Sequence, residues 1–167
     1  MGAIRARRGG ELLTLDRLLL WSEPVAEAWN LFMGSMRSKL SISDRSRELA
    51  ICCVVLFTGA DYEYNYHAPA YLAAGGSPLL LDELQRWARN QPAELREHES
   101  INGKERAIVL YAAQLTLIAK VDEQVFANLK AHFSETQLVE LTVLIGAYNM
   151  SARLLLAMDE RPAADDK

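Results

Sequence analysis

The stretch from residue 44 to residue 58 constrains the fold most strongly, because it is apolar on nearly every side. Ser43 and Asp44 provide a helix cap before it, and Gly59 is suited to end it. A helix that is apolar all round must be covered by other elements on all its faces. We therefore expect helix 44–58 to lie at the centre of the molecule.

The rest of the chain predicts further helices separated by short polar turns. No segment shows the alternation of apolar and polar residues that is typical of strands. Capping residues precede most of the expected helices; they are Ser22, Asp61, Asn102, Asp122 and Ser134. The expected helices run over about 12–21, 24–36, 44–58, 62–74, 78–89, 103–120, 123–133 and 135–158.

These boundaries predict an all-α fold with a single compact domain of about seven or eight helices over residues 12–158. We expect a mobile N-terminal arm at 1–11, a loop at 90–100 and a frayed C-terminal tail at 159–167. In helix 24–36 the apolar spacing predicts one inward face, formed by Val25, Ala28, Trp29, Phe32 and Met36.

Composition excludes several classes of protein. The chain has 167 residues, of which 50% are hydrophobic and 24% charged, as in an ordinary soluble domain. Its net charge of -4 argues against nucleic-acid binding, which needs a basic face. The uncharged run 64–81 contains prolines, glycines, Asn65 and His67, so we expect no membrane span. Adjacent Cys52 and Cys53 cannot form an ordinary disulfide and fit a reducing cytoplasm.

One group of residues points to acid–base chemistry. Glu48 lies in the first turns of the central helix, and Tyr62, Glu63 and His67 lie on the helix after Gly59. Glu63 and His67 are four residues apart and therefore share a helix face. If the chain reverses at Gly59, two carboxylates, an imidazole and a phenol meet in one cleft. Such a set is suited to proton transfer.

Two other interpretations fit the same residues. Glu63 and His67 are spaced like an exposed surface pair, and Glu48 is placed where a carboxylate favours the helix dipole. The two glutamates and His67 could also hold a metal ion. However, His98 and His132 lie in unrelated segments, and no zinc-type spacing occurs, so we expect no metal and no cofactor.

The segment SDRSRELAICCVVLFTGADYEYNYHAPAYLAAG resembles the core motif of the carboxymuconolactone decarboxylase and alkylhydroperoxidase-D family, and HFSETQLVELTVLIGAYNMSARLLLAM extends the similarity. The peroxidase branch has a Cys-x-x-Cys pair, which would fall on Ala60 and Glu63. The resemblance places the family's histidine on His67, its upstream glutamate on Glu48 and the intervening tyrosine on Tyr62. Both redox cysteines are therefore missing from this chain.

The decarboxylase branch, which lacks that cysteine pair, resembles the chain better. The resemblance implies cofactor-independent decarboxylation of a small carboxylated or lactone substrate. His67 would then be the proton donor or oxyanion partner, Glu48 would orient it, and Glu63 or Tyr62 would complete the relay. A substrate carboxylate would need a cation, for which Arg47 and Arg153 are candidates.

Two alternatives stay open: an alkylhydroperoxidase-like antioxidant protein and a non-catalytic oligomeric binding module. Cys52 lies four residues after Glu48, but the neighbouring carboxylate and apolar surroundings raise the pKa of a thiol, which lowers its reactivity. The family resemblance also implies a homo-oligomer, as a trimer, a hexamer or a dimer.

Overall fold

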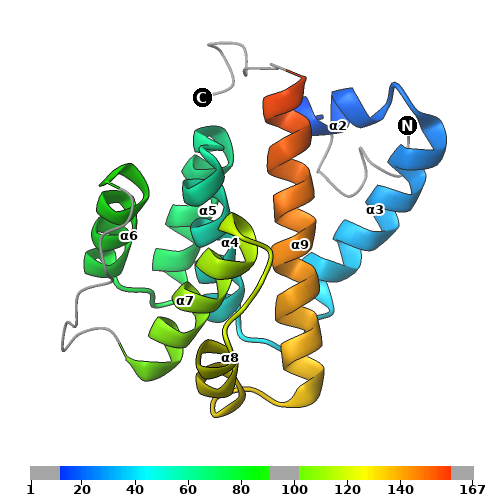
Figure 1. Cartoon of the computed structure of the whole chain (residues 1–167). Coiled ribbons are helices and arrows are strands. Elements are labelled where there is room, and N and C mark those ends of the chain that lie inside the picture. Colours follow the sequence, from blue (N-terminus) through cyan, green and yellow to red (C-terminus); the bar gives the residue numbers. More distant parts are fainter. Residues whose placement is uncertain (1–11, 91–101, 159–167) are drawn as a thin grey trace.

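The computed structural model describes residues 12–90 and 102–158, and within them the chain forms eight α-helices and no strand (Figure 1). The all-α prediction is confirmed. The helices are α2 (Thr14–Leu19), α3 (Glu23–Ser38), α4 (Asp44–Thr58), α5 (Asp61–Ala73), α6 (Pro78–Asn90), α7 (Gly103–Leu117), α8 (Glu123–Lys130) and α9 (Glu135–Ala157). The predicted arm, the predicted tail and nearly all of the predicted loop lie outside the described residues.

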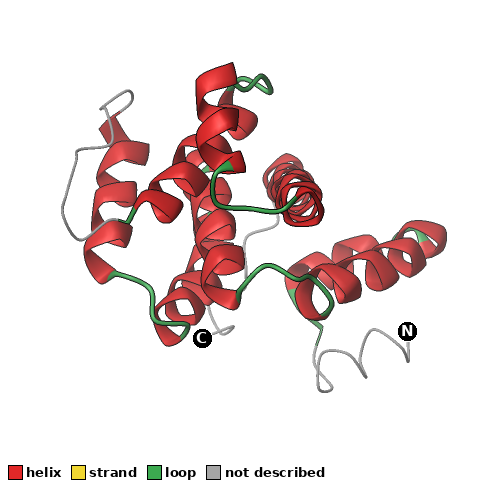
Figure 2. Cartoon of the chain, turned by 90° about the horizontal axis from the view of Figure 1, so that it is seen from below, coloured by secondary structure: helices red, strands yellow, loops and turns green. Residues whose placement is uncertain are grey.

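Helix α4 is the centre of the bundle, as its composition predicts. It packs against α5, α7 and α9, and the run from Leu49 to Val55 is almost completely buried. Helices α6 and α8 cover the outer sides of this group, while α2 and α3 lie on the opposite side of α9 (Figures 1 and 2). The fold therefore has a main bundle and an N-terminal helical pair that meets it near α9.

The two ends of α4 are set by local sequence. At its start the Ser43 side chain accepts a hydrogen bond from the Ser46 N–H. At its end Gly59 has a φ of 76°, and the N–H groups of Gly59 and Ala60 donate to the carbonyls of Leu56 and Val55. This left-handed cap satisfies the last carbonyls of α4 and reverses the chain into α5.

Several boundaries and caps differ from the sequence prediction; for example, α8 ends at Lys130 rather than near residue 133. Asp61 is not a cap: α5 begins there, Ala60 is the N-cap, and the Ala60 carbonyl accepts the first helical hydrogen bond, from the Glu63 N–H. Helix α7 ends at Leu117 rather than near residue 120, because Ala119 takes a φ of 55°. Asp122 precedes α8, but its carboxylate accepts from the Gln114 amide instead of capping the helix.

The predicted inward face of α3 is partly wrong. Ala26, Trp29 and Met33 are buried, whereas Val25 is 50% exposed and Ala28 is also exposed. Helix α3 lies at the edge of the molecule, so only a narrow stripe meets α9 and α2. This stripe repeats at intervals of three and four residues, and its next position is Arg37.

A buried carboxylate fixes the end of the bundle at which α7 begins. Glu105 is 3% exposed, and its Oε1 accepts from the Arg45 guanidinium (2.9 and 2.8 Å) and from the Tyr71 hydroxyl (2.6 Å). Its Oε2 accepts from the Asn102 amide at 3.0 Å. Arg45 belongs to α4, Tyr71 to α5, and Asn102 is the N-cap of α7, so this cluster holds the three helices together.

Helix α9 is long and apolar enough to cross a membrane by length and composition alone. The expectation of no membrane span rests on the run 64–81 and does not cover this helix. However, one side of α9 is buried against α4 and α7, and the Glu140 carboxylate accepts the Ser41 N–H at 2.8 Å. These contacts are those of a core helix in a bundle.

Replacing Gly59 with Ala tests the left-handed cap. An added Cβ would meet no atom within 4 Å, so the cost comes from the backbone conformation alone. We expect Gly59→Ala to lower the free energy of unfolding by about 1 kcal/mol in urea titrations. Glu27→Ala, on the exposed side of α3, introduces the same residue into a helix with ordinary backbone angles and should not destabilise. Equal effects of the two changes would contradict this assignment.

Candidate functional site

The reversal at Gly59 brings an acidic side chain of α4 against an imidazole of α5. The Oε2 atom of Glu48 lies 2.7 Å from Nδ1 of His67. Both side chains are largely buried, with 9% of the Glu48 side chain and 16% of the His67 side chain exposed. Because Nδ1 is held by the carboxylate, Nε2 is the ring nitrogen left to exchange a proton with a ligand.

Glu48 is held in its ionised form by two partners. Its Oε1 accepts from the Arg47 guanidinium at 3.2 and 3.1 Å, and Arg47 in turn contacts Asp44 at 2.7 Å. Burial alone would raise the pKa of Glu48, but the hydrogen bond and charge of His67, together with Arg47, lower it. The ionised carboxylate therefore holds the His67 ring through its Nδ1 atom.

The His67 ring is positioned from its other side by Tyr148 of α9. The two rings meet edge to face, with centroids 5.1 Å apart and an interplanar angle of 90°. Tyr148 is fully buried, and burial raises the pKa of its phenol, while the cation of Arg37 opposes that rise. The imidazole orientation is therefore fixed by contacts from both α4 and α9.

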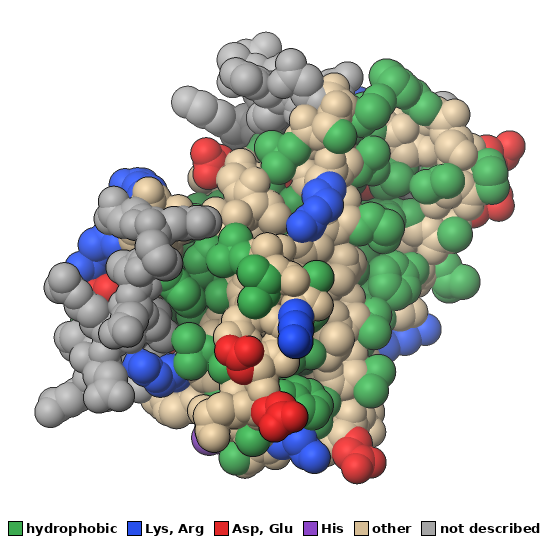
Figure 3. All heavy atoms as spheres, viewed as in Figure 1, with side chains coloured by type: hydrophobic (Ala, Val, Ile, Leu, Met, Phe, Trp, Pro, Cys, Tyr) green, Lys and Arg blue, Asp and Glu red, His purple; other side chains and the backbone are tan. Residues whose placement is uncertain are grey.

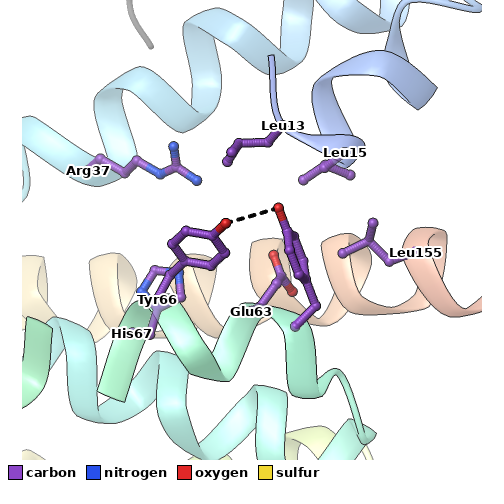
Figure 4. A pocket seen from close by; sticks show the side chains of 8 residues that line it. Leu13, Leu15, Arg37, Glu63, Tyr66, His67 and Leu155 are labelled. Carbon is purple, nitrogen blue, oxygen red and sulfur yellow. Dashed lines mark hydrogen bonds between the residues drawn. The ribbon is translucent and has the colours of Figure 1, made fainter. Parts of the chain in front are cut away.

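A pocket of about 130 Å³ lies beside this pair. Its wall is formed by side chains of the N-terminal pair, α5 and α9 (Figure 4); they are Leu13, Leu15, Arg37, Tyr62, Glu63, Tyr66, His67 and Leu155. An apolar cavity of roughly 150 Å³ is known to hold one benzene molecule. The pocket is thus sized for a small organic ligand.

The four residues singled out from the sequence take different positions. Tyr62, Glu63 and His67 line the pocket, whereas Glu48 lies behind His67 and reaches the pocket only through it. Glu63 and His67 lie on the same side of α5, as their spacing predicts. Glu63 is 8% exposed and accepts the Ser151 hydroxyl at 2.6 Å. The Tyr62 hydroxyl lies 3.3 Å from that of Tyr66.

Neither arginine named from the sequence lines the pocket. Arg47 holds Glu48, and Arg153 is exposed on α9, where it contacts Asn149. The cation that lines the pocket is Arg37 of α3, which was not predicted from the sequence. The position of Arg37, four residues after Met33 on the buried stripe, is the signal that could have identified it.

The two cysteines lie away from the pocket wall. Both are fully buried in α4, and neither is bonded in a disulfide. Burial and the nearby Glu48 carboxylate raise the pKa of Cys52, and burial raises that of Cys53. Within the part of the chain that the structure describes, no group of three His, Cys, Asp or Glu side chains is placed to hold a metal ion.

Comparisons with known proteins identify the fold. No family model matches the chain, and no curated protein matches it. A solved structure from Agrobacterium tumefaciens, of unknown function and named as a candidate antioxidant defence protein AhpD, shares 22% identity. It covers 83% of this chain and 90% of its own, with a TM-score of 0.69.

A second solved structure is an uncharacterized peroxidase-related protein from Silicibacter sp. It shares 18% identity over 97% of this chain and 82% of its own, with a TM-score of 0.74. These similarities show that the chain has an AhpD-like fold, as the sequence resemblance predicts.

The lowered pKa of Glu48 predicts a pH dependence of stability. Below the ordinary glutamate pKa of 4.5 the unfolded chain binds a proton at this residue before the folded protein does. The contribution of Glu48 is therefore complete above that pH and is lost as the pH falls through the folded pKa. In urea titrations from about pH 3 to about pH 7, Glu48→Gln should lose less stability on acidification than the wild type. The exposed Glu27→Gln variant should behave like the wild type, and equal slopes for all three proteins would contradict the prediction.

Proposed function

We propose that this chain is a cofactor-independent enzyme that protonates carbon during decarboxylation of a small carboxylated or lactone substrate. The observation that carries the proposal is the 2.7 Å contact between Glu48 and His67, with His67 on the wall of a pocket of ligand size. A carboxylate–imidazole pair of this kind is the arrangement by which enzymes hold a general acid in one tautomer and orientation.

The proposed reaction uses His67 as the acid. The bond between the carboxylate carbon and the neighbouring carbon breaks, CO2 leaves, and the electron pair moves into an adjacent carbonyl to form an enolate. Nε2 of the protonated His67 donates its proton to the carbon, and the imidazole regains a proton from water. Glu48 stays ionised and stabilises the imidazolium before the transfer.

Tyr62 and Glu63 are the remaining polar groups of the predicted set on the pocket wall. A phenol hydroxyl can donate to an enolate oxygen, and Tyr62 already lies at hydrogen-bonding distance from Tyr66. Glu63 is held by Ser151 and could relay a proton between solvent and the site. Leu13, Leu15 and Leu155 cover the apolar side, which keeps the reacting charges away from bulk water.

The names of the two structural neighbours favour a second candidate, an antioxidant protein that reduces hydroperoxides. Such chemistry requires a thiolate nucleophile and a resolving thiol. In the sequence resemblance the family's cysteine pair falls on Ala60 and Glu63, and the two cysteines of this chain are buried with raised pKa values. The site therefore favours proton transfer over thiol redox chemistry.

We also propose that the protein is a cytoplasmic homo-oligomer. Helix α9 exposes an apolar stripe of Val139, Val143 and Met150, and Val139 is 64% exposed. Hydrophobic side chains form much of the face of the molecule that carries α9 (Figure 3). Exposed apolar patches of this kind suit a subunit contact, and the two reduced thiols suit a reducing compartment.

Substitution of His67 tests the catalytic proposal. We expect His67→Gln to lower the rate of CO2 release from a lactone acid by about 10²-fold or more, because the proton donor is lost. His132→Gln, which replaces an exposed histidine, is the control and should keep full activity. An unchanged rate in His67→Gln would reject His67 as the acid.

A double substitution of the cysteines separates the alternatives. Cys52→Ser/Cys53→Ser should retain decarboxylation, whereas a thiol peroxidase would lose hydroperoxide reduction in the same variant. A binding module would show no turnover of any lactone acid, and His67→Gln would then change affinity alone.

A charge on α9 tests the subunit contact. Val139→Glu should shift the molar mass measured by light scattering towards that of a monomer, because a carboxylate would be buried in an apolar interface. Gln124→Glu adds the same charge on exposed α8 and should leave the mass unchanged. A wild-type monomer at all concentrations would contradict the proposal.

A further inference from the structure

The pocket has a cation on the wall opposite the imidazole. Arg37 extends from α3 on the same side as Leu13 and Leu15, and Glu63, Tyr66 and His67 lie on the facing wall (Figure 4). Among the eight lining residues, Arg37 is the one lysine or arginine. A ligand in the pocket therefore lies between a guanidinium and the proposed proton donor.

No carboxylate forms an ion pair with Arg37 within the described part of the chain. The ion pairs in that part of the chain join carboxylates to other basic residues, which are Arg45, Arg47, His67 and Arg86. Glu48, behind the pocket, is held by His67 and Arg47, and Glu63 on the pocket wall accepts from Ser151. A half-buried guanidinium with five donors and no carboxylate partner is suited to bind an anion.

Arg37 also acts on a buried phenol. Its charge and its hydrogen-bonding to the Tyr148 hydroxyl lower the pKa of that group, although the two groups do not reach normal hydrogen-bond geometry. The Tyr148 hydroxyl is buried with no hydrogen-bond partner among the described residues. Because Tyr148 is not among the residues that line the pocket, it can use only part of a guanidinium that has five donors.

We propose that Arg37 is the residue that selects the ligand, by binding the anionic group of a small organic acid whose apolar part lies against Leu13, Leu15 and Leu155. The inference rests on the proposed function in placing the reaction at His67. The volume of about 130 Å³ limits the part of the ligand inside the pocket to roughly the size of one small ring.

The anionic group on Arg37 differs from the one that is lost as CO2. An ion pair with Arg37 would stabilise the reacting carboxylate in the ground state. That stabilisation would be lost as the charge moves onto the neighbouring carbon, so the ion pair would raise the barrier to decarboxylation. Arg37 therefore binds a carboxylate that the reaction leaves intact. A simple monocarboxylic acid imitates the product and should bind without reacting.

Paired neutral and charged probes test this assignment. The dissociation constants of butanoate and benzoate would be compared with those of butanamide and benzamide by calorimetry, on the full chain. We expect the wild type to bind each acid about tenfold or more tightly than its amide, since the amide lacks the charge that pairs with a guanidinium.

Variants assign the preference to one residue. Arg37→Gln should lose the preference for the acid, and Arg37→Lys should keep part of it because the charge remains. Arg153→Gln removes an exposed arginine outside the pocket and should keep the whole preference. Circular dichroism and the thermal midpoint would verify that each variant is folded.

The outcomes separate this inference from the proposed function. Selective acid binding that depends on Arg37, without decarboxylation of any lactone acid, would support the inference and reject the proposed reaction. Decarboxylation of a lactone acid together with equal affinities for acid and amide would support the proposed reaction and reject the role of Arg37. Equal affinities in the wild type, an unchanged preference in a folded Arg37→Gln, or no binding of either acid at millimolar concentration would each overturn the inference.

Discussion

The contact between Glu48 and His67 depends on a single backbone reversal. Gly59 takes a left-handed conformation that ends α4 and directs α5 back along it, so residues that are 19 positions apart meet at 2.7 Å. Without that reversal Glu48 would be a buried carboxylate with Arg47 alone. The pair therefore connects the fold to the proposed chemistry, because the same turn that reverses the chain after α4 places His67 at the pocket.

The two buried carboxylates Glu105 and Glu48 contribute differently to the structure and to the site. Glu105 is surrounded by fixed donors from Arg45, Tyr71 and Asn102, so its charge is fully used in holding helices together. Glu48 instead shares its charge with an imidazole that can lose a proton and that faces a pocket. Glu105 has only donors that stay fixed as partners, which makes it structural. Glu48 has an imidazole as a partner, which makes it suited to catalysis.

The sequence predicted most of what local chemistry decides. The Ser43 cap, the Gly59 turn, the central position of α4 and the all-α fold follow from residue type and spacing, and all appear in the structure. Arg37 was missed because the apolar pattern of α3 fits two neighbouring faces, and only the packing of α3 on α9 selects the one that continues to Arg37. Tyr148 and Ser151 were also missed, because their contacts to His67 and Glu63 come from α9 and no spacing within one helix reports them.

The walls of the pocket come from two parts of the fold. Helices α4 and α5 form the rigid centre and supply Glu48 and His67, while the N-terminal pair supplies Leu13, Leu15 and Arg37 from its position across the pocket. Helix α3 has few neighbours in the main bundle, so substitutions in it can alter the ligand-facing wall at little cost to the core. On this arrangement, changes in α2 and α3 would alter which acid is bound, whereas the proton-transfer pair would stay the same.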